Sequence, residues 1–345
     1  MSEFRQDPTT REWVIMAPER AKRPQAAPRE RPAETVPDWD ESCPFCPGNE
    51  INTPDETFRL PASGHISDWE VRVVPNRFAA VTLEGDSSRT LNREFYRRMD
   101  GFGVHEVIIE TPSHNAPMAL MSYPHVENVL TAYRERYDAL KTNPQLNFIT
   151  IFKNHGRAAG TSLVHPHSQL VATPIITPYY HRRFDVAHDY HADTGHCLYC
   201  DLIAEEIANG ERIIALTKEF IVFHPYAARG PWETWIMPQR HYASFGLLPA
   251  THLQELAMVL KDTLFCFYRG LDNPAFNLII DTSTTMDEHD PYYHWLIKII
   301  PRLTTVAGFE IGSGIYVNPS IPEETALLMR EICNSCDDGE CISLR

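Results

Sequence analysis

The chain has 345 residues, 43% of them hydrophobic and 22% charged, and a formal net charge of −15 at pH 7. This composition is typical of a globular protein with a sizeable core, which excludes disordered and fibrous classes. The N-terminus lacks the pattern of a signal peptide and no apolar run reaches the roughly 20 residues of a membrane helix, so we expect a cytoplasmic protein. The acidic charge also argues against a nucleic-acid or membrane partner.

In chain order, the spacing of apolar residues predicts short strands and two long helices. The predicted elements are a strand at 70–74, a helix at 126–141, a strand at 147–152, a strand at 220–223 and a helix at 251–269. Asn-Pro pairs at 143–144 and 273–274 end the two helices. Because helices and strands do not alternate strictly, we expect an α+β fold with antiparallel sheet rather than a doubly wound fold.

The sequence contains an internal repeat. The heptapeptide NPQLNFI at 143–149 recurs as NPAFNLI at 273–279, an offset of 130 residues. Two histidines recur at offsets of 127 and 129, His114 as His241 and His165 as His294. Such nearly equal offsets indicate a duplicated domain. The expected organisation is a first domain, a linker and a second domain, at residues 1–172, 173–194 and 195–345.

The eight cysteines of a cytosolic chain are more plausible as metal ligands, core residues or catalytic groups than as disulfides. Four of them form two C-x-x-C pairs, Cys43 with Cys46 and Cys197 with Cys200. Cys266 lies in an apolar run and is expected in the core. The remaining three lie in an acidic C-terminal segment that is expected to be a solvated tail, namely Cys333, Cys336 and Cys341.

The repeat supplies histidines for both cysteine pairs. The predicted metal ligands are Cys43, Cys46, His114 and His165 in the first half, and Cys197, Cys200, His241 and His294 in the second. Four protein ligands close a tetrahedral coordination sphere, so we expect two structural Zn²⁺ sites per chain. The alternative, buried thiols beside surface histidines, leaves unexplained why both sets recur in the same order.

A polar, glycine-containing segment at 152–169 carries the candidate chemistry. Its glycines allow close backbone approach and its neutral side chains offer donors suited to phosphate oxygens; these residues are Asn154, Gly160, Thr161 and Ser162. In an extended chain, His165 and His167 share a face, so His167 would lie beside the metal while remaining free as a nucleophile. The repeat places Leu296 at the position of His167, so only the first half carries the nucleophile.

The run His-Pro-His-Ser-Gln at 165–169, with the polar segment before it, resembles the active-site motif of the galactose-1-phosphate uridylyltransferase family, a branch of the histidine-triad superfamily. The resemblance extends over nearly the whole chain. It implies two tandem histidine-triad-like domains, each with an antiparallel sheet, a long helix and a zinc site.

Three further segments resemble substrate-binding parts of that family. The resemblance assigns phosphate contacts to Arg20 and Arg23. It assigns nucleoside contacts to Asn76, Arg77 and Phe78, and nucleotide-sugar contacts to Phe309, Glu310, Ile311 and Gly312. It also implies that the active site is completed across a homodimer interface.

The activity that the resemblance implies is a ping-pong transfer of UMP from UDP-glucose to a hexose 1-phosphate, expected to be galactose 1-phosphate. His167 would carry the uridylyl group and Gln169 would donate to the phosphoryl oxygens. Histidine-triad hydrolases carry a third histidine at the position of Gln169, so a glutamine favours a transferase over a hydrolase.

Two alternatives remain open. Ser168 replaces the glycine of familiar bacterial members, and the second cysteine pair with His241 and the run 308–312 resembles the branch that contains plant ADP-glucose phosphorylase. The first alternative is therefore an ADP-sugar phosphorylase, which would transfer an adenylyl group to inorganic phosphate. A zinc-stabilised protein that binds nucleotide sugars without turnover is the non-enzymatic alternative.

Overall fold

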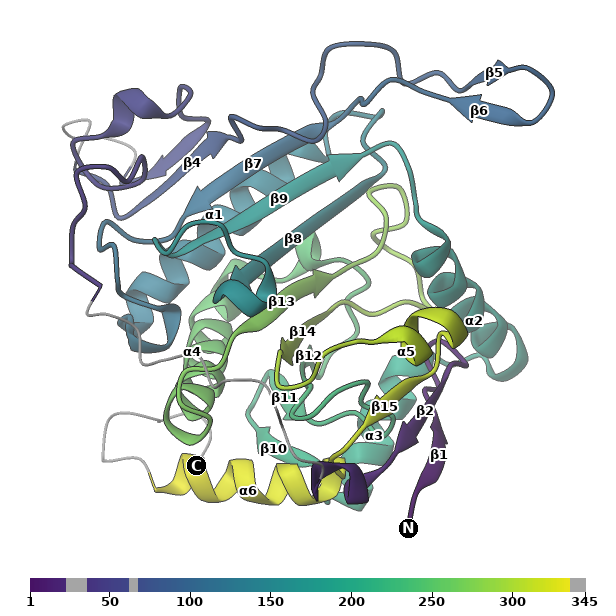
Figure 1. Ribbon diagram of the computed structural model, residues 1–345. Coiled ribbons are helices and arrows are strands. Elements are labelled where there is room, and N and C mark those ends of the chain that lie inside the picture. The colour runs from purple at the N-terminus through teal and green to yellow at the C-terminus, as the bar shows by residue number, and fades with distance from the viewer. Residues whose placement is uncertain (23–35, 62–67, 336–345) are drawn as a thin grey trace.

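The structure is a computed structural model that describes residues 1–22, 36–61 and 68–335 (Figure 1). Its centre is one ten-stranded sheet in which all neighbouring strands pair antiparallel. Across the sheet the strands are β10 (Ile213–Leu216), β11 (Phe220–Phe223), β12 (Thr234–Pro238), β14 (Leu296–Pro301), β13 (Phe276–Asp281), β8 (Phe148–His155), β9 (His167–Thr173), β7 (Val104–Ile109), β4 (Val71–Pro75) and β3 (Phe58–Leu60).

The sheet consists of two halves with the same topology. From the outer edge inward, the first half has the order β3-β4-β7-β9-β8 and the second half has the order β10-β11-β12-β14-β13. The expected α+β class and the duplication are therefore confirmed. The two sheets are not separate, because β8 pairs with β13 through five residue pairs from Phe276 opposite His155 to Ile280 opposite Ile151.

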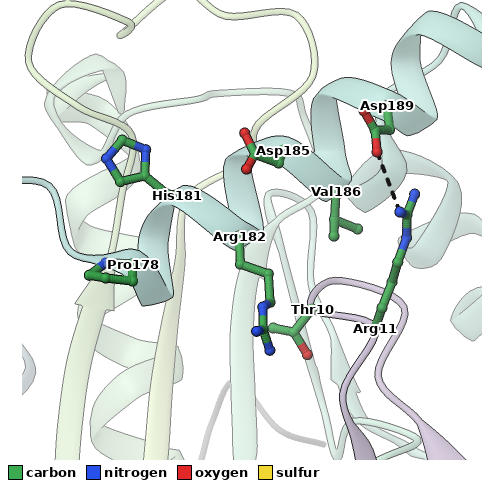
Figure 2. Close-up of a pocket in the computed structure, with 8 residues that line it drawn as sticks. All are labelled: Thr10, Arg11, Pro178, His181, Arg182, Asp185, Val186 and Asp189. Carbon is green, nitrogen blue, oxygen red and sulfur yellow. Dashed lines mark ion pairs between the residues drawn. The ribbon is translucent and has the colours of Figure 1, made fainter.

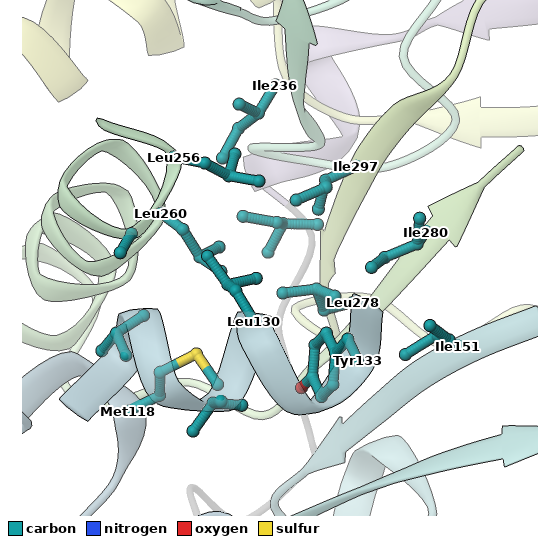
Figure 3. Close-up of a cluster of buried hydrophobic side chains, with 14 of the residues drawn as sticks. Met118, Leu130, Tyr133, Ile151, Ile236, Leu256, Leu260, Leu278, Ile280 and Ile297 are labelled. Atoms are coloured by element: carbon teal, nitrogen blue, oxygen red, sulfur yellow. The ribbon is translucent and has the colours of Figure 1, made fainter. Parts of the chain in front are cut away.

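Both long helices cover one face of this sheet. They are α1 (Tyr123–Leu140) and α4 (Leu253–Gly270), each within three residues of its predicted bounds. Ser122 caps α1 by accepting the backbone N–H of His125. The two helices and the sheet enclose the main hydrophobic core, and Figure 3 shows Leu130 of α1 next to Leu260 of α4 there, with Leu278 of β13 beside them.

Among the described residues, helices cover the opposite face only over the second half. These helices are α2 (Pro178–Thr194) and α3 (Leu198–Asn209), which pack on β11, β12 and β14. The segment expected as a linker, 173–194, therefore consists mostly of helix α2. Its buried residues follow helical spacing but include Tyr180 and Arg183, so the apolar pattern is weak in the sequence.

A three-stranded sheet lies against the second half. It contains β1 (Glu3–Gln6), β2 (Trp13–Met16) and β15 (Tyr316–Asn318), with β15 parallel to β2. The other strands and α-helices of the described residues are the projecting hairpin of β5 (Thr90–Asn92) and β6 (Tyr96–Arg98), α5 (Gly308–Ser313) and α6 (Pro322–Asn334); short 3-10 helices lie in the connections. Among the helices that the structure describes, none has the length and apolarity required to cross a bilayer.

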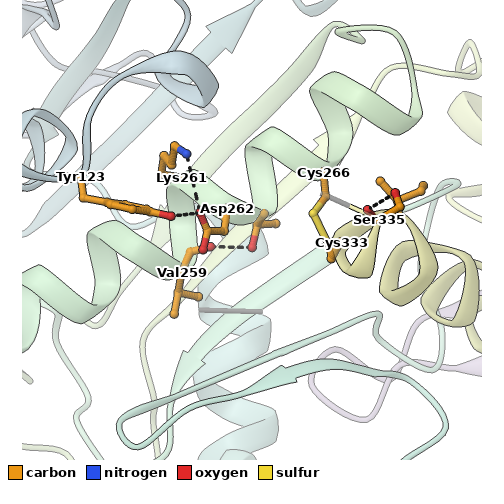
Figure 4. Close-up of a disulfide and its surroundings, with 9 residues drawn as sticks. Tyr123, Val259, Lys261, Asp262, Cys266, Cys333 and Ser335 are labelled. Carbon is orange, nitrogen blue, oxygen red and sulfur yellow. Dashed lines mark hydrogen bonds and ion pairs between the residues drawn. A yellow bond between two sulfur atoms is a disulfide. The ribbon is translucent and has the colours of Figure 1, made fainter. Parts of the chain in front are cut away.

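Two cysteines differ from the expectation. Cys266 is in the core as predicted, but it forms a disulfide with Cys333 that joins α4 to α6 (Figure 4). Cys333 is fully buried rather than part of a solvated tail, because α6 packs against α4. The two residues are 67 positions apart, so no local spacing reveals the pair. Cys336 and Cys341 lie outside the described residues.

Replacing Leu130 with alanine is expected to lower the free energy of unfolding by about 2–5 kcal/mol, because this fully buried side chain leaves a cavity between α1 and the sheet. Urea denaturation measures the change. The matched control is Leu327→Ala on α6, which is 51% exposed and is expected to change stability by about 0.5 kcal/mol or less. Equal effects of the two substitutions would contradict this placement of the core.

Candidate active site and metal centres

The first Cys2His2 group is assembled at the end of the first half-sheet. Cys43, Cys46, His114 and His165 are buried, and their ligand atoms all lie within 4.8 Å of one another. The Sγ–Nδ1 distances are 3.4 Å from Cys46 to His114 and 3.6 Å from Cys46 to His165. A tetrahedral Zn²⁺ with ordinary bond lengths would place S and N about 3.6 Å apart, so the group fits such an ion.

The second group has the same geometry. Cys197, Cys200, His241 and His294 also lie within 4.8 Å of one another, with Sγ–Nδ1 distances of 3.5 and 3.7 Å from Cys200 to the two histidines. This group is closer to solvent, because Cys200 is half-buried and His241 exposed.

Hydrogen bonds from the ring Nε2 atoms to backbone carbonyls orient three of the histidines for a metal. The Nε2 atom of His165 donates to the carbonyl of Thr111 at 2.7 Å, and that of His294 donates to Pro238 at 3.0 Å. Because a carbonyl only accepts, Nε2 carries the proton and Nδ1 keeps its lone pair toward the cysteines. His241 does the same through the carbonyl of Asp290 at 2.9 Å.

His167 is the first residue of β9 and is 7% exposed. Its Nδ1 donates to the carbonyl of His165 at 2.8 Å, so the lone pair of the neutral ring is on Nε2. Burial lowers the pKa of His167, and the charge of Lys153 acts in the same direction. The ring also contacts Phe45 edge-on at 5.5 Å between centroids, which connects it to the turn between Cys43 and Cys46.

Gln169 lies two residues further along β9, on the same face as His167. Its Oε1 accepts a hydrogen bond from Nε2 of His105 at 2.8 Å, and Nδ1 of that histidine accepts the backbone N–H of Ala80 at 3.1 Å. Since a backbone N–H can only donate, the proton of the neutral His105 ring is on Nε2. The amide NH₂ of Gln169 therefore remains available for a ligand.

The polar segment after β8 forms a tight loop on the same face. Asn154 lies on β8, and Gly160 has a φ of 93°, a left-handed conformation that favours glycine. A Cβ built on Gly160 would lie 4.0 Å from Nδ2 of Asn154. Thr161 is half-buried and its hydroxyl donates to the carbonyl of Leu163, whereas Ser162 is exposed.

The predicted nucleoside segment follows β4. Asn76 is half-buried next to His105, with 3.1 Å between its Nδ2 and the His105 Nε2. Its Oδ1 accepts the backbone N–H of Phe78 at 2.8 Å. Arg77 and Phe78 are exposed, and Phe78 exposes 87% of its surface. An aromatic ring so free of internal contacts is open to a ligand or a partner.

The other predicted substrate residues lie elsewhere in the chain. Arg20 is exposed in a short 3-10 helix at Pro18–Lys22, directly after β2. Helix α5 carries Phe309, Glu310, Ile311 and Gly312. Figure 1 places α5 beside β15 over the second half, away from the start of β9. Arg23 lies outside the described residues.

A buried polar network behind β9 was missed by the sequence reasoning. Lys153 pairs with Glu110 at 2.6 Å and also donates to the carbonyl of His167 at 3.3 Å. The hydroxyl of Ser168 donates to Glu110 and contacts the hydroxyl of Tyr133 on α1. The side chain of Ser168 thus faces the helices and not the side of the sheet that carries His167.

Phe45 and His105 were also missed. The only sequence signal for Phe45 is its place between two paired cysteines, and His105 had none, because its contact with Gln169 depends on the pairing of β7 with β9. A hollow of about 540 Å³ lies between the β1–β2 turn and α2. Its lining residues include Arg11 and Arg182 (Figure 2). None of the predicted site residues lines this hollow.

The second half has a different composition at the equivalent positions. Leu296 begins β14 as His167 begins β9, and it is buried under α2 and α3. By strand register, Lys298 and Asp281 occupy the positions of Gln169 and Asn154. They form an ion pair at 2.6 Å that also contacts Arg183 of α2.

Comparison with known proteins agrees with this architecture. The family described as "Galactose-1-phosphate uridyl transferase, N-terminal domain" matches residues 1–177. ADP-glucose phosphorylase of Arabidopsis thaliana is 35% identical over 333 residues, 96% of this chain and 93% of that protein. Galactose-1-phosphate uridylyltransferase of Thermotoga maritima is 25% identical over 339 residues, 96% of this chain and 98% of that protein.

A solved structure has the same fold. The crystal structure of the Arabidopsis thaliana ADP-glucose phosphorylase with bound ADP-glucose matches with a TM-score of 0.83 at 36% identity, over 96% of this chain and 98% of that one. Because the similarity spans nearly the whole chain and the family match alone covers more than half of it, the chain belongs to the galactose-1-phosphate uridylyltransferase family.

Proposed function

We propose that this protein is a nucleotidyltransferase that cleaves a nucleoside diphosphate sugar through a nucleotidyl group carried on His167. The observation that carries the proposal is the hydrogen bond from Nδ1 of His167 to the carbonyl of His165, which leaves the lone pair of Nε2 for attack. The membership of the chain in a family of enzymes acting on nucleotide sugars and sugar phosphates supports it.

The reaction proceeds in two displacements. Nε2 of His167 attacks the α-phosphorus, and the bond from that phosphorus to the bridging oxygen breaks as the sugar 1-phosphate leaves with the electron pair. An oxygen of the acceptor phosphate then attacks the same phosphorus and releases His167. The amide groups of Gln169 and Asn154 donate to the phosphoryl oxygens as charge develops on them.

We propose ADP-glucose as the donor and inorganic phosphate as the acceptor. Of the two relatives compared, the protein named ADP-glucose phosphorylase is 35% identical and the uridylyltransferase is 25% identical, at the same coverage of this chain. Ser168 does not discriminate between the two, because its side chain faces away from His167.

The second candidate is transfer of UMP from UDP-glucose to a hexose 1-phosphate such as galactose 1-phosphate. The sequence His-Pro-His at 165–167 favours this transfer, as does the sequence similarity to the Thermotoga maritima uridylyltransferase, which spans 98% of that protein.

We also propose that both Cys2His2 groups hold structural Zn²⁺, which would keep the cysteines as thiolates. In the first half, the cysteine turn also holds Phe45 against His167. We further propose a homodimer in which α5 of a second copy completes the active site; the exposed side chains of Phe309 and Ile311, at 53% and 76%, leave α5 free for such a contact.

Incubation with ADP-glucose is expected to give an adenylyl adduct on the wild-type protein and none on His167→Ala, as intact-protein mass spectrometry measures. UDP-glucose is the parallel incubation, and a uridylyl adduct alone would favour the second candidate. Binding of either nucleotide sugar without any adduct would support the non-enzymatic alternative.

The rate of adduct formation is expected to stay constant as the pH falls through about 6.5, the ordinary histidine pKa. Burial lowers the pKa of His167, so the reactive neutral ring persists at more acidic pH, and the rate declines only below that lowered pKa. Single-turnover measurements with ADP-glucose test this. A rate that halves near pH 6.5 would contradict the buried position of the ring.

Elemental analysis is expected to find two zinc ions per chain, one of which is lost in Cys43→Ala and the other in Cys197→Ala. Because Phe45 connects the first site to His167, Cys43→Ala should also slow adduct formation. Cys197→Ala should lower the melting temperature and leave adduct formation largely intact. Two ions retained after either substitution would contradict the ligand assignment.

A further inference from the structure

The second half, which lacks the nucleophile, contacts the polar loop of the first half directly. The ring of His155 stacks on Phe276 with centroids 4.8 Å apart, and its Nε2 donates to Oδ1 of Asn273 at 2.9 Å. Gly156 approaches so closely that a Cβ there would lie 2.7 Å from the Cβ of Ala275. The repeated segment NPAFN at 273–277 is therefore the surface on which the loop rests.

Strand register places Asn277 of this segment beside the candidate active site. Asn277 lies directly opposite Asn154 in the β8–β13 pair, and Phe152 lies opposite Gln169 in the β8–β9 pair. Paired residues have their side chains on the same face, as do residues two apart on one strand. Asn277, Asn154 and Gln169 consequently share the face that carries His167.

The partners of Asn277 fix the orientation of its amide. Its Oδ1 accepts a hydrogen bond from Nε of Arg302, and its Nδ2 donates to the carbonyl of Ala159 at 2.9 Å. A guanidinium can only donate and a carbonyl can only accept, so the reversed amide would lose both hydrogen bonds. Asn277 is 8% exposed, which makes such a loss costly.

The fixed amide of Asn277 in turn orients Asn154. Nδ2 of Asn277 also donates to Oδ1 of Asn154 at 2.7 Å, so Asn154 must direct its oxygen toward Asn277. Its NH₂ group then points toward the Gly160 loop, where a phosphate oxygen would find a donor.

We propose that Asn277 is a positioning residue of the nucleotidyl-transfer site, which it serves by holding the amide of Asn154 in the donating orientation and the carbonyl of Ala159 in place. The proposal rests on the proposed function, since it assumes that a phosphoryl group binds at Asn154. It assigns the second half a part in the reaction that the first half performs.

The test is Asn277→Asp, which keeps the shape and the contact with Arg302 but removes both donated hydrogen bonds. Asn154 would then turn its NH₂ toward the carboxylate and present its oxygen to the phosphate. We expect adduct formation on His167 to slow by about 10- to 100-fold with a smaller change in KM, because the lost donor acts mainly in the transition state.

Asn147→Asp is the matched control. Asn147 holds the same place in the first copy of the repeated motif, and its Nδ2 also donates to a carbonyl, that of Pro174, at 3.1 Å. We expect this variant to keep the wild-type rate, with both variants keeping two metal ions and a wild-type circular dichroism spectrum. Equal rates for Asn277→Asp and wild type would overturn the proposal.

A double-mutant cycle tests the route through Asn154. In the background of Asn154→Ala, the further change Asn277→Asp should cost little, because the amide that it orients is already gone. Fully additive losses would show that Asn277 acts by another route and would overturn the proposal.

Calorimetry with AMP separates this proposal from the proposed function. If the wild-type protein forms no adduct with either nucleotide sugar, the proposed function fails. The AMP affinities of Asn277→Asp and Asn147→Asp can still be compared in that case. Weaker binding in Asn277→Asp alone supports the positioning role, whereas equal affinities would refute it.

Discussion

Five residue pairs between β8 and β13 join the duplicated halves into one sheet, and most other features of the molecule depend on this junction. It gives α1 and α4 a common face to cover, so that one hydrophobic core serves both halves. It also brings the second half within hydrogen-bonding distance of the Gly156–Gly160 loop. Without it, each half would expose a sheet edge and lose half of the shared core.

The two Cys2His2 groups and the candidate nucleophile His167 could be picked out from the sequence because their signals are local or repeated. A C-x-x-C spacing needs no knowledge of the fold, and two histidines recurring in the same order identify the missing ligands. His167 stood out because its counterpart in the second copy is Leu296. The structure brings each set of two cysteines and two histidines together and places His167 at the start of β9.

The supporting residues could not be predicted, since their roles arise from strand register and not from spacing. His105 reaches Gln169 only because β7 pairs with β9, and Asn277 reaches Asn154 only because β13 pairs with β8. A disulfide between Cys266 and Cys333 likewise depends on how α6 packs against α4. Helix α2 escaped prediction because its buried side includes the charged residue Arg183.

The position of α2 makes the two halves of the duplicated fold unequal. Its residues cover the face of the second half that corresponds to the His167 face of the first half, and the ion pair of Lys298 with Asp281 lies where the first half has Gln169 and Asn154. A histidine placed at position 296 would therefore be buried under α2 and α3 and closed to a ligand. The two copies of the fold thus differ in access as well as in sequence, because among the described residues only the second half has helices over the face that corresponds to the one carrying His167.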